Sequence, residues 1–103
     1  MRAPEIKANQ KINQKAVFMQ KLWSDLAWDQ LEDWSMRDKK TYRKICHLIK
    51  SIDRNGYSCI GKPEPLKNNR AGWWSVRIDD FNRLVFRIED GQIVILSCMG
   101  HYE

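Results

Sequence analysis

Four side chains in the second half of this 103-residue chain carry groups that could do chemistry on a charged substrate. Glu64 stands between two prolines, which fix their own φ and restrict the residue before them, so its carboxylate is presented on a stiff, extended stretch. His101, near the C-terminus, has the side chain whose proton moves near neutral pH. Arg77 and Arg83 have planar guanidinium groups that can clamp phosphate oxygens. Together these groups suit proton transfer beside an anion.

The register of the C-terminal strands is expected to bring the two arginines together. Asp90-Gly91 between two β-branched runs predicts a two-residue type I′ hairpin, in which Phe86 faces Ile95. A three-residue turn before that hairpin then puts Arg77 directly across from Arg83. Like charges opposed across a sheet are unfavourable, so we expect this pair to bind an anion. Two solvated arginines on a polar face are the alternative.

Hydrophobic periodicity predicts the elements that must position these residues. Residues 17–23 are expected to form a strand, and Ser24 is a natural N-cap for a first helix with the buried stripe Ala27, Trp28, Leu31 and Trp34. Asp38 should cap a second helix that ends at Asn55-Gly56 and has the core face Tyr42, Ile45, Cys46, Ile49 and Ile52. Three antiparallel strands follow, with Trp74 in the core. The predicted fold class is α+β: a strand, two helices, then a three-stranded antiparallel meander, with the helices packed on one sheet face.

Composition predicts one globular domain with an acidic partner. Residues 1–16 are polar and basic, with too few apolar side chains to bury a face, and are expected to be a flexible basic arm ahead of a folded domain over residues 17–103. The net charge is +5, and nucleic acid is the commonest acidic partner of a basic protein. Charge alone leaves a soluble protein that happens to be basic as the alternative. The basic side of the second helix, from Lys39 to His47, is either a solvated face or a nucleic-acid or ribosome contact.

The cysteines and the hydropathy pattern predict a cytoplasmic protein. Cys46, Cys59 and Cys98 are odd in number and lack C-x-x-C spacing, so we expect buried free thiols in a reducing compartment and no zinc site. No stretch of the sequence is apolar over the length of a membrane span.

Several motifs of the chain, in their order and spacing, resemble the Txe/YoeB toxins of the RelE/ParE superfamily from about Gln20 to Tyr102. The motifs are Gly61-Lys62-Pro63-Glu64-Pro65-Leu66-Lys67, Gly72-Trp73-Trp74-Ser75 with Arg77-Ile78, Arg83-Leu84-Val85, and the terminal His101-Tyr102. The resemblance implies the RelE-like microbial ribonuclease fold and a ribosome-dependent endoribonuclease that cuts mRNA in the decoding site, without metal or other cofactor. It also implies a cognate antitoxin of the YefM/Axe type, homodimers, and operator DNA binding together with the antitoxin.

The same resemblance implies a role for each candidate site residue. Glu64 matches the general base and His101 the general acid, while Arg83 and Arg77 match the arginines at the scissile phosphate. The remaining candidates are the terminal Tyr102 in the catalytic set, with Lys67, Lys62 and Trp73 as RNA or phosphate ligands. The chain departs from the family pattern at Val76, Asn82, Phe86 and Met99-Gly100, where arginine, histidine, tyrosine and an Arg-Tyr pair are usual.

The simple hairpin register leaves one geometric problem at the C-terminus. It puts Tyr102 on the arginine face but His101 on the apolar face. We therefore predict that Gly100 breaks the alternation through a bulge or sharp twist and turns His101 into the cleft. A disordered tail is the alternative.

Two rival functions fit the same fold. A gyrase-inhibiting relative is not expected to need a carboxylate and a histidine, so Glu64 and His101 argue against it. A non-catalytic RNA-binding or antitoxin-docking module would keep its function when either residue is changed to alanine.

Overall fold

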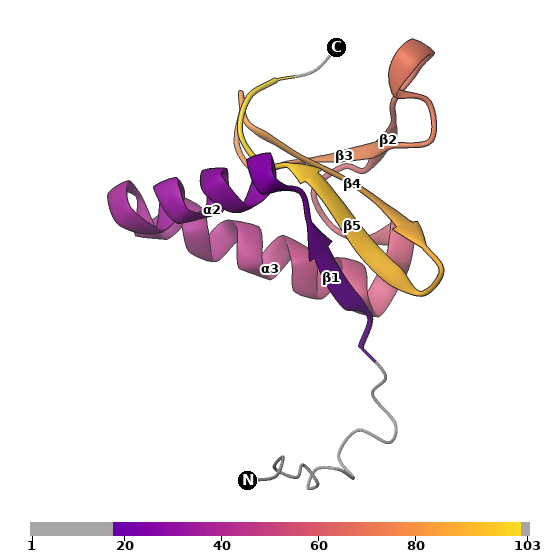
Figure 1. Ribbon diagram of the computed structural model, residues 1–103, viewed down its shortest axis with the longest axis horizontal. Helices are drawn as coiled ribbons and strands as arrows, with labels where there is room; N and C mark the ends of the chain where they lie inside the picture. The colour runs from indigo at the N-terminus through magenta and orange to yellow at the C-terminus, as the bar shows by residue number, and fades with distance from the viewer. Residues whose placement is uncertain (1–17, 102–103) are drawn as a thin grey trace, which may run out of the picture.

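A five-stranded mixed sheet with two helices makes up residues 18–101, the part of the chain that the computed structural model describes (Figure 1). The predicted arm over residues 1–16 and the candidate Tyr102 lie outside the described residues. In chain order the elements are β1 (Gln20–Trp23), α2 (Asp25–Arg37), α3 (Lys39–Asn55), the 3₁₀ turn η2 (Gly56–Ser58), β2 (Glu64–Pro65), the 3₁₀ turn η3 (Asn68–Arg70), β3 (Trp74–Arg77), β4 (Arg83–Glu89) and β5 (Gln92–Ser97).

The α+β class and the helices packed on the sheet confirm the prediction, but the sheet is wider than a three-stranded meander. Its strand order is β1-β5-β4-β3-β2. β1 pairs in parallel with β5, so the first strand joins the last one along the chain. The two-residue β2 pairs antiparallel with β3 at the other edge, a position that suits a proline-flanked segment because proline cannot donate to a central ladder. Figure 1 shows α2 and α3 side by side, with β1 next to β5.

Both helices begin at the residues that their local chemistry predicts. The Ser24 hydroxyl accepts a hydrogen bond from the backbone N–H of Ala27 at 2.9 Å and donates to the carbonyl of Leu96 at 2.7 Å, so the cap also ties α2 to β5. Asp38 caps α3 by accepting from the backbone and the hydroxyl of Thr41. These hydrogen bonds, that of the hydroxyl foremost, lower the pKa of the Asp38 carboxyl.

The core lies between the helices and one sheet face. Most of its fully buried side chains come from α3 and the three central strands: Ile45, Leu48, Ile52, Val76, Leu84, Phe86, Ile93 and Ile95. Ala27 of α2 and Cys98 after β5 are also fully buried in this core. Trp74 packs at the edge of this core, stacked on Tyr57 with 4.5 Å between ring centroids. His47 and the basic residues before it on α3 are exposed, as predicted for a solvated face.

Four residues predicted on the buried faces of the helices are not fully buried; two of them, Leu31 and Tyr42, are half-buried and pack against the core. Trp28 is 49% exposed, because at about 100° per residue it lies at the margin of the stripe that Ala27 and Trp34 define. It packs edge-on against Trp23 instead. Cys46 is a free thiol that is only half-buried, whereas the other two cysteines are free and buried as predicted.

The hairpin register is confirmed up to a β-bulge. Asp90 and Gly91 both have positive φ, and Phe86 pairs with Ile95. The next residue of β4, Val85, pairs with Ser97, so Leu96 is the extra residue of a bulge. The alternation is therefore already broken at Leu96, four residues before the predicted break at Gly100.

The bulge reverses the faces of the residues that follow it. Without the bulge, strict alternation would put Cys98 on the arginine face, but Cys98 is fully buried in the core, where its thiol contacts the carbonyl of Ala27. Ser97 joins the face of Val85 instead. Gly100 adds a second departure, with a φ of +97° that favours glycine.

Candidate active site

The sheet face turned away from the core carries Glu64 at one end. Strand pairing puts Glu64 beside Ser75, Ser75 beside Val85, and Val85 beside Ser97. Paired residues point to the same side of a sheet, and the neighbouring Val76 points into the core. This row of four residues therefore faces the other way. Ser75, Val85 and Ser97 have small side chains that are buried, whereas Glu64 is exposed.

The two candidate phosphate-binding arginines lie on the same face as Glu64. Arg77 is two residues along β3 from Ser75, Arg83 is two residues along β4 from Val85, and the two arginines are directly paired, as predicted. The Arg83 guanidinium donates from Nη1 to the carbonyls of Asp79 at 2.8 Å and Asn82 at 3.2 Å. This fixes the guanidinium against the turn between β3 and β4.

The backbone conformation of Gly61 positions the loop that carries Glu64. Gly61 has a φ of +95°, and its carbonyl accepts the backbone N–H of Arg77 at 2.8 Å. A Cβ at this position would lie 3.0 Å from side-chain atoms of Leu48 and Val76, so only glycine allows the loop to approach the core this closely. The loop therefore enters β2 at a fixed point beside β3.

The three candidate RNA ligands around Glu64 differ in how exposed their side chains are. Lys62 and Lys67 are exposed on either side of β2. Trp73 is half-buried, and the Arg87 guanidinium lies 4.4 Å from the centroid of its ring. Arg87 also forms an ion pair with Glu89 at 2.7 Å. One face of the Trp73 ring is therefore covered by a cation.

His101 is exposed at the end of the described chain, next to the β3–β4 turn. Its imidazole stacks on the Phe81 ring, with 5.6 Å between centroids and 23° between planes. The residue before it, Gly100, accepts a hydrogen bond from the backbone N–H of Arg83 at 2.9 Å. Across the sheet the order is thus Glu64, Arg77, Arg83 and His101.

The β3–β4 turn has a role that the sequence prediction missed. The Asp79 carboxylate accepts from the backbone N–H groups of Phe81 and Asn82 and from the Asn82 amide. Burial alone would raise the pKa of Asp79, but these hydrogen bonds and the nearby Arg83 charge outweigh it, so its pKa is lowered. An Asp whose carboxylate can accept from the backbone N–H groups two and three residues further on is a recognisable turn signal, and Asp79 was therefore the available clue.

The sequence also did not predict the two hydrogen bonds that hold the C-terminal tail against α2. The Trp34 indole N–H donates to the Cys98 carbonyl at 2.9 Å, and the Gln30 side-chain oxygen accepts the Cys98 backbone N–H at 2.7 Å. Both partners are more than 60 residues away in sequence, so no local pattern points to them.

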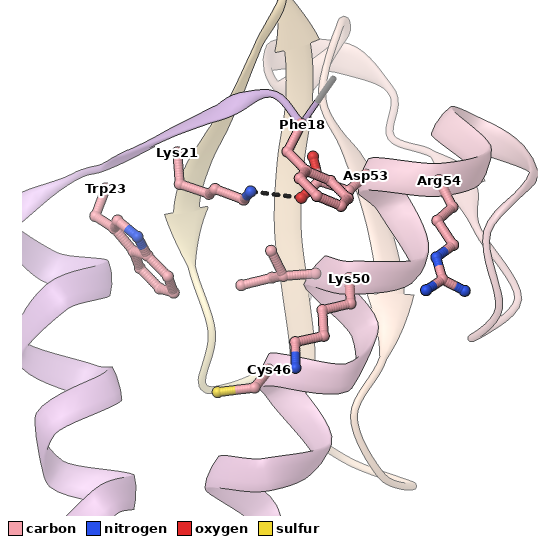
Figure 2. Close-up of a pocket in the computed structure, with 8 residues that line it drawn as sticks. Phe18, Lys21, Trp23, Cys46, Lys50, Asp53 and Arg54 are labelled. Atoms are coloured by element: carbon pink, nitrogen blue, oxygen red, sulfur yellow. Dashed lines mark hydrogen bonds and ion pairs between the residues drawn. The ribbon is translucent and has the colours of Figure 1, made fainter. Parts of the chain in front are cut away.

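A separate pocket of about 620 Å³ lies at the opposite edge of the sheet, between β1 and α3 (Figure 2). Figure 2 shows Lys21 pointing to Asp53, with which it forms an ion pair. The other lining residues are Phe18, Trp23, Cys46, Ile49, Lys50 and Arg54. Of the candidate catalytic residues, the three that the structure describes (Glu64, Arg83 and His101) do not line this pocket, so it is distinct from the face that carries Glu64.

Metal and membrane features were sought among the described residues. Over residues 18–101 no group of three or more His, Cys, Asp or Glu side chains is arranged to hold a metal ion. Neither helix in that range is long and apolar enough to cross a membrane.

The fold defines a class of small bacterial toxins. A YoeB dimer from Staphylococcus aureus has a TM-score of 0.78 and 42% identity, covering 84% of this chain and all of that one. A YoeB-YefM complex from the same organism gives a TM-score of 0.77 and 41% identity, again covering 84% of this chain and all of that one. Within that class, the model of the YoeB-like toxin of bacterial type II toxin-antitoxin systems matches residues 23–102. Toxin YoeB of Escherichia coli K12 is 42% identical over 84 residues, which are 82% of this chain and the whole relative. This chain therefore belongs to the YoeB-like toxin family, as its motifs predicted.

Proposed function

We propose that this YoeB-like toxin is a ribosome-dependent endoribonuclease that cuts mRNA in the decoding site without a metal ion. The observation that carries the proposal is the order Glu64, Arg77, Arg83 and His101 from strand to strand across the sheet. Neighbouring strands are about 4.8 Å apart, so the three steps across the strands span about 14 Å. Glu64 is also offset along β3, because it pairs with Ser75 and not with Arg77. A phosphodiester bound between the arginines would lie between a carboxylate and an imidazole.

Each residue has a defined role in the proposed reaction. Glu64 takes the proton of the 2′-hydroxyl, whose oxygen attacks the adjacent phosphorus. Arg77 and Arg83 hold the non-bridging oxygens and stabilise the charge that grows on them. His101 gives a proton to the departing 5′-oxygen. The products are a 2′,3′-cyclic phosphate and a 5′-hydroxyl.

The remaining candidates bind the RNA around the scissile bond. Lys62 and Lys67 flank Glu64 and are exposed, so they can contact neighbouring phosphates. Tyr102 completes the catalytic set. Trp73 can stack an unpaired base on the ring face that Arg87 leaves open.

The partners follow from the proposed activity and from the relatives. Structures of S. aureus YoeB include a dimer and a complex with YefM. We expect this chain to form homodimers and to bind a cognate YefM-like antitoxin, whose acidic segment covers the arginine face. Together with the antitoxin it binds operator DNA. Action on ribosomes and mRNA requires the cytoplasm.

The test is mRNA cleavage in a purified translation system. Wild-type protein should generate new mRNA ends that carry a 2′,3′-cyclic phosphate. Glu64→Gln and His101→Gln should each lower the cleavage rate by about 10² to 10⁴. The matched controls are Glu32→Gln and His47→Gln, two exposed positions on the helices, and they should cleave at the wild-type rate.

Two results would remove the proposal. Equal inhibition of translation by the wild type and both site variants would show that Glu64 and His101 are not catalytic, as expected of a binding module. Inhibition of DNA gyrase supercoiling without any mRNA cleavage would identify the gyrase-inhibiting alternative.

A further inference from the structure

The tail that carries His101 is too short to hold the imidazole by itself. β5 ends at Ser97, and chain ends of a few residues are poorly ordered unless other parts of the fold bind them. The described contacts of the last residues are with α2, through the Cys98 backbone, and with the β3–β4 turn. The turn is the nearer of the two anchors to His101.

Both backbone polar groups of Gly100 are bound by this turn. Its N–H donates to the Asn82 side-chain oxygen at 2.9 Å, and its carbonyl accepts the Arg83 N–H at 2.9 Å. Asn82 therefore holds the peptide unit between Met99 and Gly100, and Arg83 holds the next one, between Gly100 and His101. The φ of +97° at Gly100 then sets the direction in which the chain leaves β5.

Asp79 sets which way the Asn82 amide points. The Asn82 nitrogen lies 3.0 and 3.3 Å from the two Asp79 carboxylate oxygens. A carboxylate accepts hydrogen bonds and does not donate them, so the amide N–H₂ must face Asp79 and the amide oxygen must face Gly100. The Asp79 carboxylate is itself fixed by two backbone N–H groups of the turn.

Phe81 sets the plane of the imidazole. Its ring is 61% exposed, so it contributes little to the core, and its described ring contact is the stack on His101. The same β3–β4 turn holds the Arg83 guanidinium through the carbonyls of Asp79 and Asn82. One turn thus fixes both a phosphate ligand and the proton donor.

We propose that Asn82 and Phe81 are positioning residues for His101: the Asn82 amide, oriented by Asp79, holds the N–H of the preceding Gly100, and the Phe81 ring holds the imidazole. Asn82 is one of the positions at which this chain departs from the family pattern. The inference depends on the proposed nuclease function for its catalytic consequence, but the hold on His101 is measurable without any cleavage.

The first measurement is NMR on isotope-labelled protein. In Asn82→Ala, the Gly100 amide should exchange with solvent faster than in the wild type, because its acceptor is gone. In Phe81→Leu, the His101 imidazole resonances should move as the ring stack is lost. In Phe81→Tyr, which keeps an aromatic ring, the His101 resonances should stay close to their wild-type positions. The exposed His47 on α3 is the internal control, and its resonances should stay unchanged in every variant.

The second measurement is single-turnover mRNA cleavage. A misplacement of about 1 Å can cost about 10² in rate, so Asn82→Ala and Phe81→Leu should cleave up to about 10²-fold more slowly while binding ribosomes as tightly as the wild type. Phe81→Tyr should cleave at close to the wild-type rate. Because Phe81 is exposed, its variants fold even where Asn82→Ala does not.

The outcomes separate this inference from the proposed function. Unchanged Gly100 exchange in Asn82→Ala and unchanged His101 resonances in Phe81→Leu overturn the hold on His101. Altered NMR signals with an unchanged cleavage rate overturn the positioning role. If the wild type cleaves no mRNA, the nuclease proposal fails, and the NMR results still decide whether the turn holds His101.

Discussion

Replacing Gln30 with alanine should destabilise the protein through a single lost hydrogen bond. The Gln30 side-chain oxygen accepts the backbone N–H of Cys98 at 2.7 Å, and Cys98 is fully buried. A buried donor left without an acceptor costs about 1–3 kcal/mol. Alanine is the better helix former by at most about 0.7 kcal/mol, so the free energy of unfolding should fall by about 1–2 kcal/mol. A domain of this size has about 5–15 kcal/mol in total, so the loss is measurable.

Urea denaturation followed by tryptophan fluorescence measures this loss. The midpoint should fall while the slope with urea stays constant, because the surface exposed on unfolding is unchanged. The melting temperature should drop by about 4–8 °C for each kcal/mol. The matched control is Gln20→Ala on β1, whose side chain is exposed and lies 3.5 Å from Gln92; its change should stay within about 0.5 kcal/mol. A Gln30→Ala loss no larger than that of the control would refute the anchoring of the tail on α2.

Three further predictions concern caps, thiols and the loop before Glu64. Ser24→Ala should lower the free energy of unfolding by about 1–2 kcal/mol in urea, because the N-cap and the bond to β5 are lost together; an unchanged midpoint would contradict this. Burial raises the pKa of Cys98 to about 12 and also raises that of Cys59, so at pH 8 both thiols are neutral. A thiol reagent should then label Cys46 in the folded protein and the other two only in denaturant, as mass spectrometry will report. Gly61→Ala should cost about 1–3 kcal/mol by overpacking, in addition to the strain of its positive φ; a variant as stable as the wild type in thermal melts would disprove the close approach.

Local chemistry accounts for what the sequence predicted correctly. The two helix caps at Ser24 and Asp38 depend on hydrogen bonds within three residues. The hairpin depends on Asp90-Gly91, whose positive φ values few other residue pairs adopt. Short-range interactions of this kind can be predicted from neighbouring residues. They were sufficient to predict the strand register that pairs Arg77 with Arg83.

The sequence by itself thus determined the α+β class, the caps, the hairpin and the family motifs, because each depends on neighbouring residues or on periodicity. Only the tertiary structure decided the parallel pairing of β1 with β5, the bulge at Leu96 and the anchoring of the tail. The strand pairing and the anchoring of the tail join residues about 70 positions apart. Such long-range features depend on the packing of the whole core. For example, Cys98 can be buried only because α2 supplies hydrogen-bond partners for its backbone N–H and carbonyl. The position of His101 therefore depends on the assembled fold.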